Sequence, residues 1–171
     1  MSMKTLTALL VFAFVTAHAA SPVVRPAPDF SFSGIGGTKS SRSLRGQPVV
    51  VIVAKSPKTR AFRKQVQIIE DTYRELASRG TVFVVAFSEG GESVASNVPF
   101  VVANNGPAVA AAYGLTGDMV LGVVGPDGNL DLFTGEVTRG LRIREIIQNS
   151  FPAQNTTRRE QPKGPPLISA Q

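Results

Sequence analysis

The chain has 171 residues, of which 43% are hydrophobic, with a formal net charge of +6, one histidine and no cysteine. This length suits one domain with tails better than two domains, and the apolar content can supply one core. The absence of cysteine excludes thiol redox chemistry, disulfide bonds and cysteine-ligated zinc sites.

Residues 1–20 have the pattern of an export signal. An apolar run from Leu6 to Val15 precedes Ala17-His18-Ala19, the small-x-small sequence that signal peptidase accepts. The run is shorter than the roughly 20 residues of a membrane-spanning helix. We therefore expect cleavage near Ala19 or Ala20 and export to the periplasm or the medium, with an uncleaved anchor as the alternative. Cleavage removes His18 and with it the imidazole base that Ser-His and Cys-His nucleophile pairs need.

The two ends of the exported chain lack the periodicity of folded elements. Residues 21–26 contain proline without a regular pattern, which indicates a linker. Residues 152–171 are rich in proline and basic residues and contain few large apolar side chains. Such a tail cannot bury enough apolar surface to offset its ordering entropy. We expect one domain over residues 27–151 and a disordered tail after it.

The first turn signal of the domain is Gly34-Ile35-Gly36-Gly37. A phosphate-binding loop of the Walker type would need a Gly-Lys-Ser/Thr ending before a helix. The segment that begins at Lys39 lacks that frame. The glycine-rich stretch therefore predicts a hairpin turn.

A strand-helix-strand unit follows. Pro48–Ala54 and Thr81–Phe87 are continuous apolar runs, typical of strands buried on both faces. Between them, Ser56-Pro57 predicts a helix N-cap with proline at the first helical position, and Gly80 predicts the helix end. One helical face carries the apolar side chains Phe62, Val66, Ile69, Tyr73 and Leu76. The order and spacing predict a right-handed parallel crossover.

The second half of the domain has a different pattern. Pro107–Tyr113 predicts a short helix, and Met119–Val124 predicts another buried strand. The turn cluster Pro126–Asn129 precedes an alternating segment from Leu130, which indicates an antiparallel hairpin. A last helix is expected from Thr138 or Gly140 until just before Pro152. Together the elements predict an α/β fold with a mixed four-strand sheet covered by helices on both faces.

Four motifs in this order resemble those of the thioredoxin-like superfamily, in particular its exported members and the peroxiredoxin branch. Ala27–Phe30 (APDF) resembles the opening motif of that branch, and Ser43–Val51 is similar to the lead into its first core strand. Ala112–Gly117 (AYGLTG) resembles the stretch before the third core strand, and Val123–Asn129 (VVGPDGN) its hairpin. The resemblance covers residues 27–151 and implies a thioredoxin-like fold.

The resemblance also implies where redox chemistry would take place. In working members the cysteines lie at the start of the helix after the first core strand, where a helix N-terminus lowers a thiol pKa. That place is occupied here by Lys55, Ser56, Pro57, Lys58, Thr59, Arg60 and Ala61. The cis-proline that faces the site in the family is replaced by Met119. The fold carries over, and the family's functional residues do not.

A cluster of basic residues surrounds the same place. Eight cations and no acidic residue lie between Lys39 and Lys64: Lys39, Arg42, Arg45, Lys55, Lys58, Arg60, Arg63 and Lys64. They form either a solvated face or a patch that attracts anions. The free backbone N–H groups at the helix N-terminus would add to the positive electrostatic potential of five of them: Lys55, Lys58, Arg60, Arg63 and Lys64. Nucleic acid is not an expected target, since no aromatic residues interleave with the charges.

Other chemistry has weaker support. Ser56 or Thr59 would need a neighbouring base such as Lys55 or Lys58 to act as a nucleophile. Glu89 and Glu92 share a loop, which indicates either a solvated loop or a metal or acid/base pair. Asp118 is expected to form an ion pair with the basic helix start.

The sequence therefore predicts a redox-inactive, exported domain that binds a protein partner in the envelope. We expect no cofactor and no metal. The alternatives are an enzyme that uses non-thiol chemistry and an anion-binding protein that acts through residues 39–64.

Overall fold

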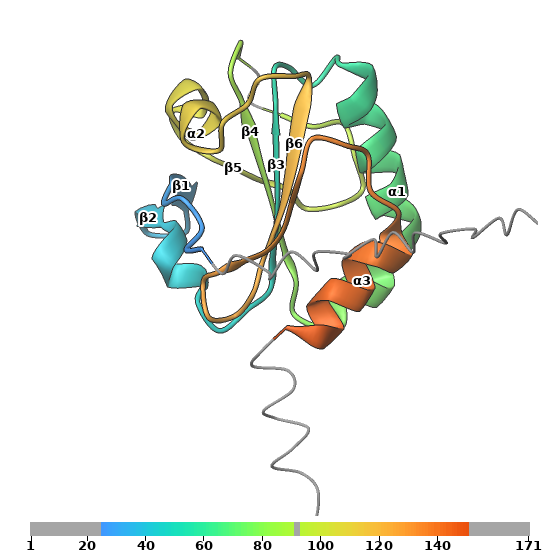
Figure 1. The fold of residues 1–171 in the computed structure, drawn as a ribbon. Helices are drawn as coiled ribbons and strands as arrows, with labels where there is room; N and C mark the ends of the chain where they lie inside the picture. Colours follow the sequence, from blue (N-terminus) through green and yellow to red (C-terminus); the bar gives the residue numbers. More distant parts are fainter. Residues whose placement is uncertain (1–24, 91–92, 151–171) are drawn as a thin grey trace, which may run out of the picture.

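A five-stranded sheet runs through the centre of the computed structural model, which describes residues 25–90 and 93–150 (Figure 1). The strand order is β5-β4-β3-β6-β7. The strands span Val49–Ala54 (β3), Val82–Phe87 (β4), Val101–Val102 (β5), Met119–Val124 (β6) and Leu130–Thr134 (β7). The central β3 pairs in parallel with β4 and antiparallel with β6, and the β6–β7 hairpin is antiparallel. The predicted crossover and hairpin are confirmed.

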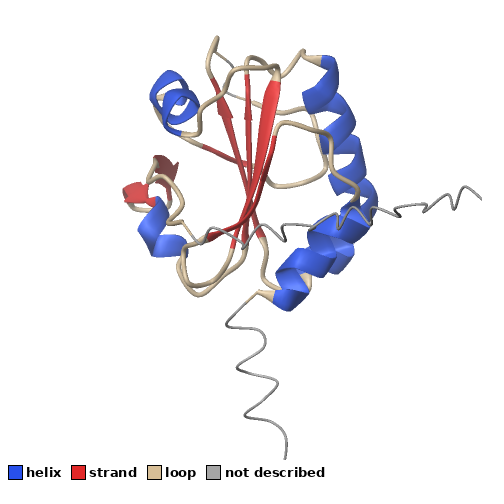
Figure 2. Ribbon diagram, viewed as in Figure 1, coloured by secondary structure: helices blue, strands red, loops and turns tan. Residues whose placement is uncertain are grey.

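Both faces of the sheet are covered, as the unbroken apolar strands predict. Helices α1 (Arg60–Ala77) and α3 (Gly140–Asn149) lie on one face (Figure 2). On the other face lie α2 (Gly106–Ala112), the short η1 helix (Ser41–Leu44) and the hairpin of β1 (Ser31–Gly34) and β2 (Gly37–Ser40). The expected hairpin turn between Gly34 and Gly37 is confirmed.

Alternate residues of β3 point into two separate cores, because successive side chains of a strand face opposite sides. Val50 and Ile52 pack under α1 and α3 with Phe62, Ile69 and Ile143. Val51 and Val53 pack on the opposite side, against Phe30, Val109 and Tyr113. All six residues of β3 are buried.

Two expectations about the elements are wrong in detail. The sheet has five strands and not four, because β5 is an edge strand of only two residues, too short to show any alternation in the sequence. Helix α1 begins at Arg60 and not at Pro57. The Thr59 amide donates to the Ser56 carbonyl at 3.3 Å, so Ser56-Pro57 opens a β-turn, with proline at the position that β-turns favour. Thr59 then has an extended backbone and is the N-cap.

Contacts with the domain begin before residue 27. Pro26 forms an antiparallel bridge with Asn129, and the Leu130 amide donates to the Arg25 carbonyl at 2.9 Å. Residues 25–26 of the expected linker therefore lie against the β6–β7 turn. The predicted signal peptide, the rest of the linker and the tail from residue 152 lie outside the described residues. Within residues 25–90 and 93–150, no helix has the length and apolar character to cross a membrane.

Candidate functional site

The connection from β3 to α1 lies at one edge of the sheet. Ala54, the last residue of β3, pairs with Phe87 at the end of β4 and with Met119 at the start of β6. The structure thus brings Met119 beside the segment Lys55–Ala61, as the resemblance implies.

Hydrogen bonds within the connection use its hydroxyl groups. The Ser56 hydroxyl accepts from the Lys58 amide at 3.2 Å, and the Thr59 hydroxyl donates to the Ser56 carbonyl at 3.2 Å. Neither hydroxyl is bonded to an amine or carboxylate among the described residues. The arrangement therefore lacks the nucleophile–base contact that hydroxyl catalysis requires.

Lys55 is engaged with Asp118. Its amide donates to the Asp118 carbonyl, and its ammonium group lies 3.2 Å from a carboxylate oxygen of Asp118. The ion pair expected for Asp118 is confirmed. Both side chains are largely in water, so the pair contributes little to stability, on the order of 0–1 kcal/mol.

Apolar side chains fill the interior of this edge. Met119 is only 2% exposed, and Phe62 packs edge-on against Phe87 with the ring centroids 5.1 Å apart. Every described peptide bond is trans, so Met119 provides none of the geometry of a cis-proline. Met119, at the place where the resemblance implies a groove-shaping proline, is therefore part of the core.

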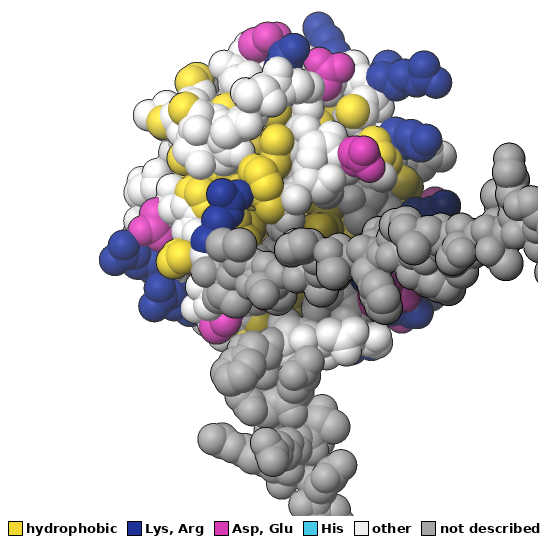
Figure 3. Space-filling model, in the orientation of Figure 1, with side chains coloured by type: hydrophobic (Ala, Val, Ile, Leu, Met, Phe, Trp, Pro, Cys, Tyr) yellow, Lys and Arg dark blue, Asp and Glu magenta, His cyan; other side chains and the backbone are white. Residues whose placement is uncertain are grey.

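The basic run does not form one patch, which corrects the expectation for residues 39–64. Lys39, Arg42 and Arg45 lie on β2 and beside η1, whereas the cations from Lys55 to Lys64 lie around the start of α1, across the sheet (Figure 1). The space-filling view likewise shows separate groups of basic side chains (Figure 3). The two groups separate because β3 runs between them, a length of roughly 17 Å.

The α1 group remains a candidate for anion binding. Lys58, Arg60, Arg63 and Lys64 are exposed. The first turn of α1 contains no acidic residue, and Thr59 makes no side-chain capping bond. The anion-binding prediction for this group stays a prediction.

The expected carboxylate pair is only partly described. The Glu89 amide donates to the Lys55 carbonyl at 2.9 Å, which ties its loop to the β3–α1 connection. Glu92 lies outside the described residues. Among residues 25–90 and 93–150 no group of three metal-ligating side chains occurs.

A groove runs along the first half of α1, which the sequence patterns did not indicate. It encloses about 540 Å³ between α1 and residues 93–95. Phe62, Val66 and Val94 form its apolar part, and Lys58 and Arg63 supply positive charge. The Glu70 carboxylate fixes the opposite wall by accepting from the Ser96 hydroxyl at 2.7 Å.

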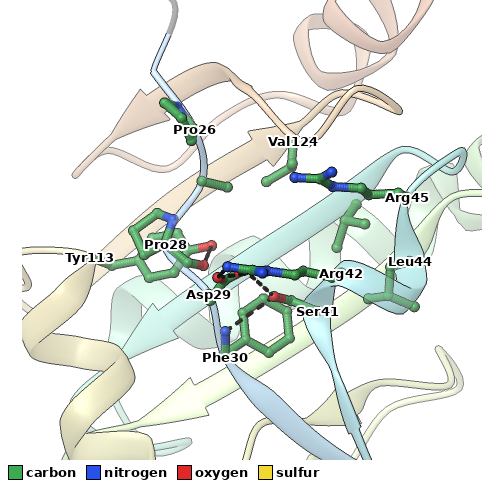
Figure 4. Close-up of a pocket in the computed structure, with 13 residues that line it drawn as sticks. Pro26, Pro28, Asp29, Phe30, Ser41, Arg42, Leu44, Arg45, Tyr113 and Val124 are labelled. Atoms are coloured by element: carbon green, nitrogen blue, oxygen red, sulfur yellow. Dashed lines mark hydrogen bonds and ion pairs between the residues drawn. The ribbon is translucent and has the colours of Figure 1, made fainter.

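A second cavity, of about 130 Å³, lies at the far end of the sheet between the segment 26–30 and η1 (Figure 4). Asp29 accepts from Arg42 at 2.6 and 3.0 Å and from the Ser41 hydroxyl at 3.2 Å. These bonds, led by that of Arg42, lower the pKa of Asp29. Burial raises the pKa of Tyr113, whose hydroxyl donates to the Pro28 carbonyl at 3.4 Å.

Comparison with solved structures shows that the fold is thioredoxin-like. The thioredoxin domain of thiol-disulfide oxidoreductase BVU-2223 from Bacteroides vulgatus matches with 16% identity and a TM-score of 0.57, over 72% of this chain and 96% of that one. The exposed lipoprotein thioredoxin Etrx1 of Streptococcus pneumoniae matches with 15% identity and a TM-score of 0.54, over 71% and 98%. The peroxidoxin BcpB of Mycobacterium tuberculosis matches with 16% identity and a TM-score of 0.52, over 81% and 97%.

These identities establish the fold and not the activity. No protein-family model and no curated protein matches the sequence. The chain shares the architecture of thiol-disulfide oxidoreductases and has no cysteine with which to perform their chemistry.

Proposed function

We propose that this thioredoxin-like domain is exported and works in the cell envelope by binding a protein partner, without thiol chemistry. The observation that carries the proposal is the filled β3–α1 connection. Its hydroxyl groups are used in local hydrogen bonds, its lysine at position 55 is paired, and Met119 is packed into the core.

The groove along α1 is the surface we assign to the partner. Phe62 and Val66 at its base are 1% and 6% exposed, Val94 adds a partly buried apolar side chain, and the exposed Lys58 and Arg63 also line it. Apolar contacts supply affinity, and complementary charge selects the partner and its orientation. The chemistry that fits is an extended protein segment with apolar side chains beside acidic ones.

Two observations support export. Residues 1–20 carry the signal pattern described above. One structural neighbour is an exposed lipoprotein thioredoxin, which indicates that the fold is used at a cell surface.

A non-thiol enzyme is the weaker candidate, because no described base contacts the hydroxyl of Ser56 or Thr59. A serine or threonine hydroxyl without such a base is a poor nucleophile.

Site-specific photo-crosslinking in envelope preparations tests the binding proposal. A photoreactive residue is placed at Lys58 or Gln67, both of which line the groove, and at Arg79 beyond the end of α1 as the control. We expect one protein to be crosslinked from the two groove positions and not from Arg79. Cell fractionation of the same variants is expected to recover the protein outside the cytoplasm.

Two results would contradict the proposal. One is turnover of a peroxide or a disulfide substrate by the purified protein, because it would show redox activity in a domain that we propose only binds. The other is a crosslinking pattern that is the same at the groove and at Arg79.

A further inference from the structure

The cavity at the far end of the sheet combines an apolar interior with an unpaired cation at its mouth. Phe30, Val49, Tyr113 and Val124 line it, and each of these residues is less than one-tenth exposed. Its volume of about 130 Å³ is close to that of the roughly 150 Å³ apolar cavity known to accept a benzene ring. The space therefore suits one small ring or one branched aliphatic group.

Two cations line the cavity, Arg42 and Arg45, while the nearby Arg25 packs over the Phe133 ring with its Cζ 4.4 Å from the ring centroid. Arg42 directs both Nε and one terminal nitrogen at a single carboxylate oxygen of Asp29, so these two charges offset each other. Arg45 forms no ion pair or side-chain hydrogen bond with any described residue. Figure 4 shows its guanidinium across the cavity from the Asp29–Arg42 pair.

The backbone holds Arg45 in this position. The Gly46 amide donates to the Pro126 carbonyl at 2.9 Å and joins the end of η1 to the β6–β7 turn. Gly128 in that turn has a φ of +87°, and the Arg45 Nε lies 3.3 Å from the point where a Cβ of residue 128 would stand. The guanidinium thus packs over a glycine, and a larger residue there would displace it.

We propose that this cavity binds a small monocarboxylic acid, with its apolar body among Phe30, Val49, Tyr113 and Val124 and its carboxylate on Arg45. A guanidinium presents a planar fork that matches a carboxylate in two parallel hydrogen bonds. One net positive charge suits a monoanion, whereas a phosphate dianion would require a second free cation. The site is separate from the groove along α1 and goes beyond the proposed function.

Titration of the isotope-labelled protein with benzoate, followed by the amide resonances of Gly46, Gly125 and Gly128, tests this proposal. We expect saturable shifts centred on these glycines, with a Kd on the order of 1–10 mM for so small a ligand. Benzyl alcohol, which has the same ring without the charge, is expected to bind at least about tenfold more weakly. Inorganic phosphate is expected to cause no saturable shift.

Three variants sharpen the test. Arg45→Gln is expected to weaken benzoate binding about tenfold or more, and Leu44→Phe to weaken it by filling the cavity. Arg74→Gln, which removes the same charge from an exposed position of α1 outside the groove, leaves the affinity unchanged. Asp29→Asn frees Arg42, and this variant is expected to gain phosphate binding.

The proposal is overturned by an absence of saturation, by equal affinity for benzyl alcohol or phosphate, or by unchanged affinity in Arg45→Gln. Amide spectra of each variant establish that it is folded, so a loss of binding cannot be confused with a loss of structure. Failure here leaves the crosslinking pattern along α1 unaffected.

Discussion

The two ends of the central sheet are built from the same strands but differ in how tightly the interior is packed. At the end formed by Ala54 and Met119, the interior between the sheet and α1 is packed with apolar side chains, and the groove along α1 and the charged groups lie on the outer surface. At the end formed by Val49 and Val124, a cavity remains beneath η1.

The packed end shows how the fold is kept without a cysteine at the place where the resemblance implies one. The strands need apolar neighbours on both faces regardless of chemistry, and Met119 supplies one where the resemblance implies a proline. The two surfaces to which we assign binding differ in this respect: the groove along α1 includes Pro57 and Lys58 of the β3–α1 connection, whereas the far cavity shares no residue with that connection.

The largest change in stability is expected at the packed end of the sheet, where Met119 is buried. Met119→Ala should lower the free energy of unfolding by about 2–5 kcal/mol, because a buried side chain is lost and the site collapses only partly. Urea unfolding measures this loss. Leu141→Ala, at a position that is 57% exposed, is the control and should change stability by no more than about 0.5 kcal/mol. A similarly small loss for Met119→Ala would mean that this end is not tightly packed.

A smaller effect is expected for Asp131, which lies in β7 just after the β6–β7 turn. Burial, with a contribution from Asp127, raises the pKa of Asp131 to about 6. In the unfolded chain the pKa of this carboxyl is about 3.9, so the folded state binds the proton more tightly. The free energy of unfolding therefore falls as the pH rises from about 4 to 6. Asp131→Asn should remove this fall and raise stability at pH 7 by no more than about 1 kcal/mol, because part of the carboxyl is in water.

Urea unfolding at pH 4 and pH 7 measures this effect as the difference between the variant and the unchanged protein. The difference cancels the opposite contribution of Asp29, whose pKa is lowered and whose stabilisation is lost on acidification. Asp71→Asn, an exposed position on α1, serves as the control. The same pH dependence in Asp131→Asn would show that Asp131 does not cause the fall.

The smallest effect concerns the two basic groups. We expect retention on a heparin matrix to fall more when Arg60, Arg63 and Lys64 are changed to glutamine than when Lys39, Arg42 and Arg45 are. Both triple variants lose three charges, but Arg42 is already paired with Asp29. These interactions are screened over about 8–10 Å at physiological ionic strength, so elution salt is the measurement. Equal shifts would show that the two groups contribute equally and would contradict this prediction.

Local sequence patterns were enough to predict the strand-helix-strand core and the closing hairpin, and composition alone excludes thiol chemistry. Continuous β-branched runs and the α1 face from Phe62 to Leu76 are local signals, and each is strong enough to predict its element. The order of the elements and the four motifs then predicted the fold and the edge at which Lys55–Ala61 and Met119 meet.

Which surfaces are continuous depends on how the elements pack in three dimensions. Lys39 and Lys64 are the two ends of one basic run in the sequence, yet β3 lies between them in the structure. Conversely, Asp29, Arg45 and Tyr113 come from distant segments and enclose one cavity. Residues that are close in sequence can lie on different surfaces when a buried strand runs between them. Residues from distant segments can share a surface when the fold brings those segments together. Short elements such as β5 also depend on tertiary structure, because pairing with a neighbouring strand stabilises a segment whose sequence shows no strand pattern.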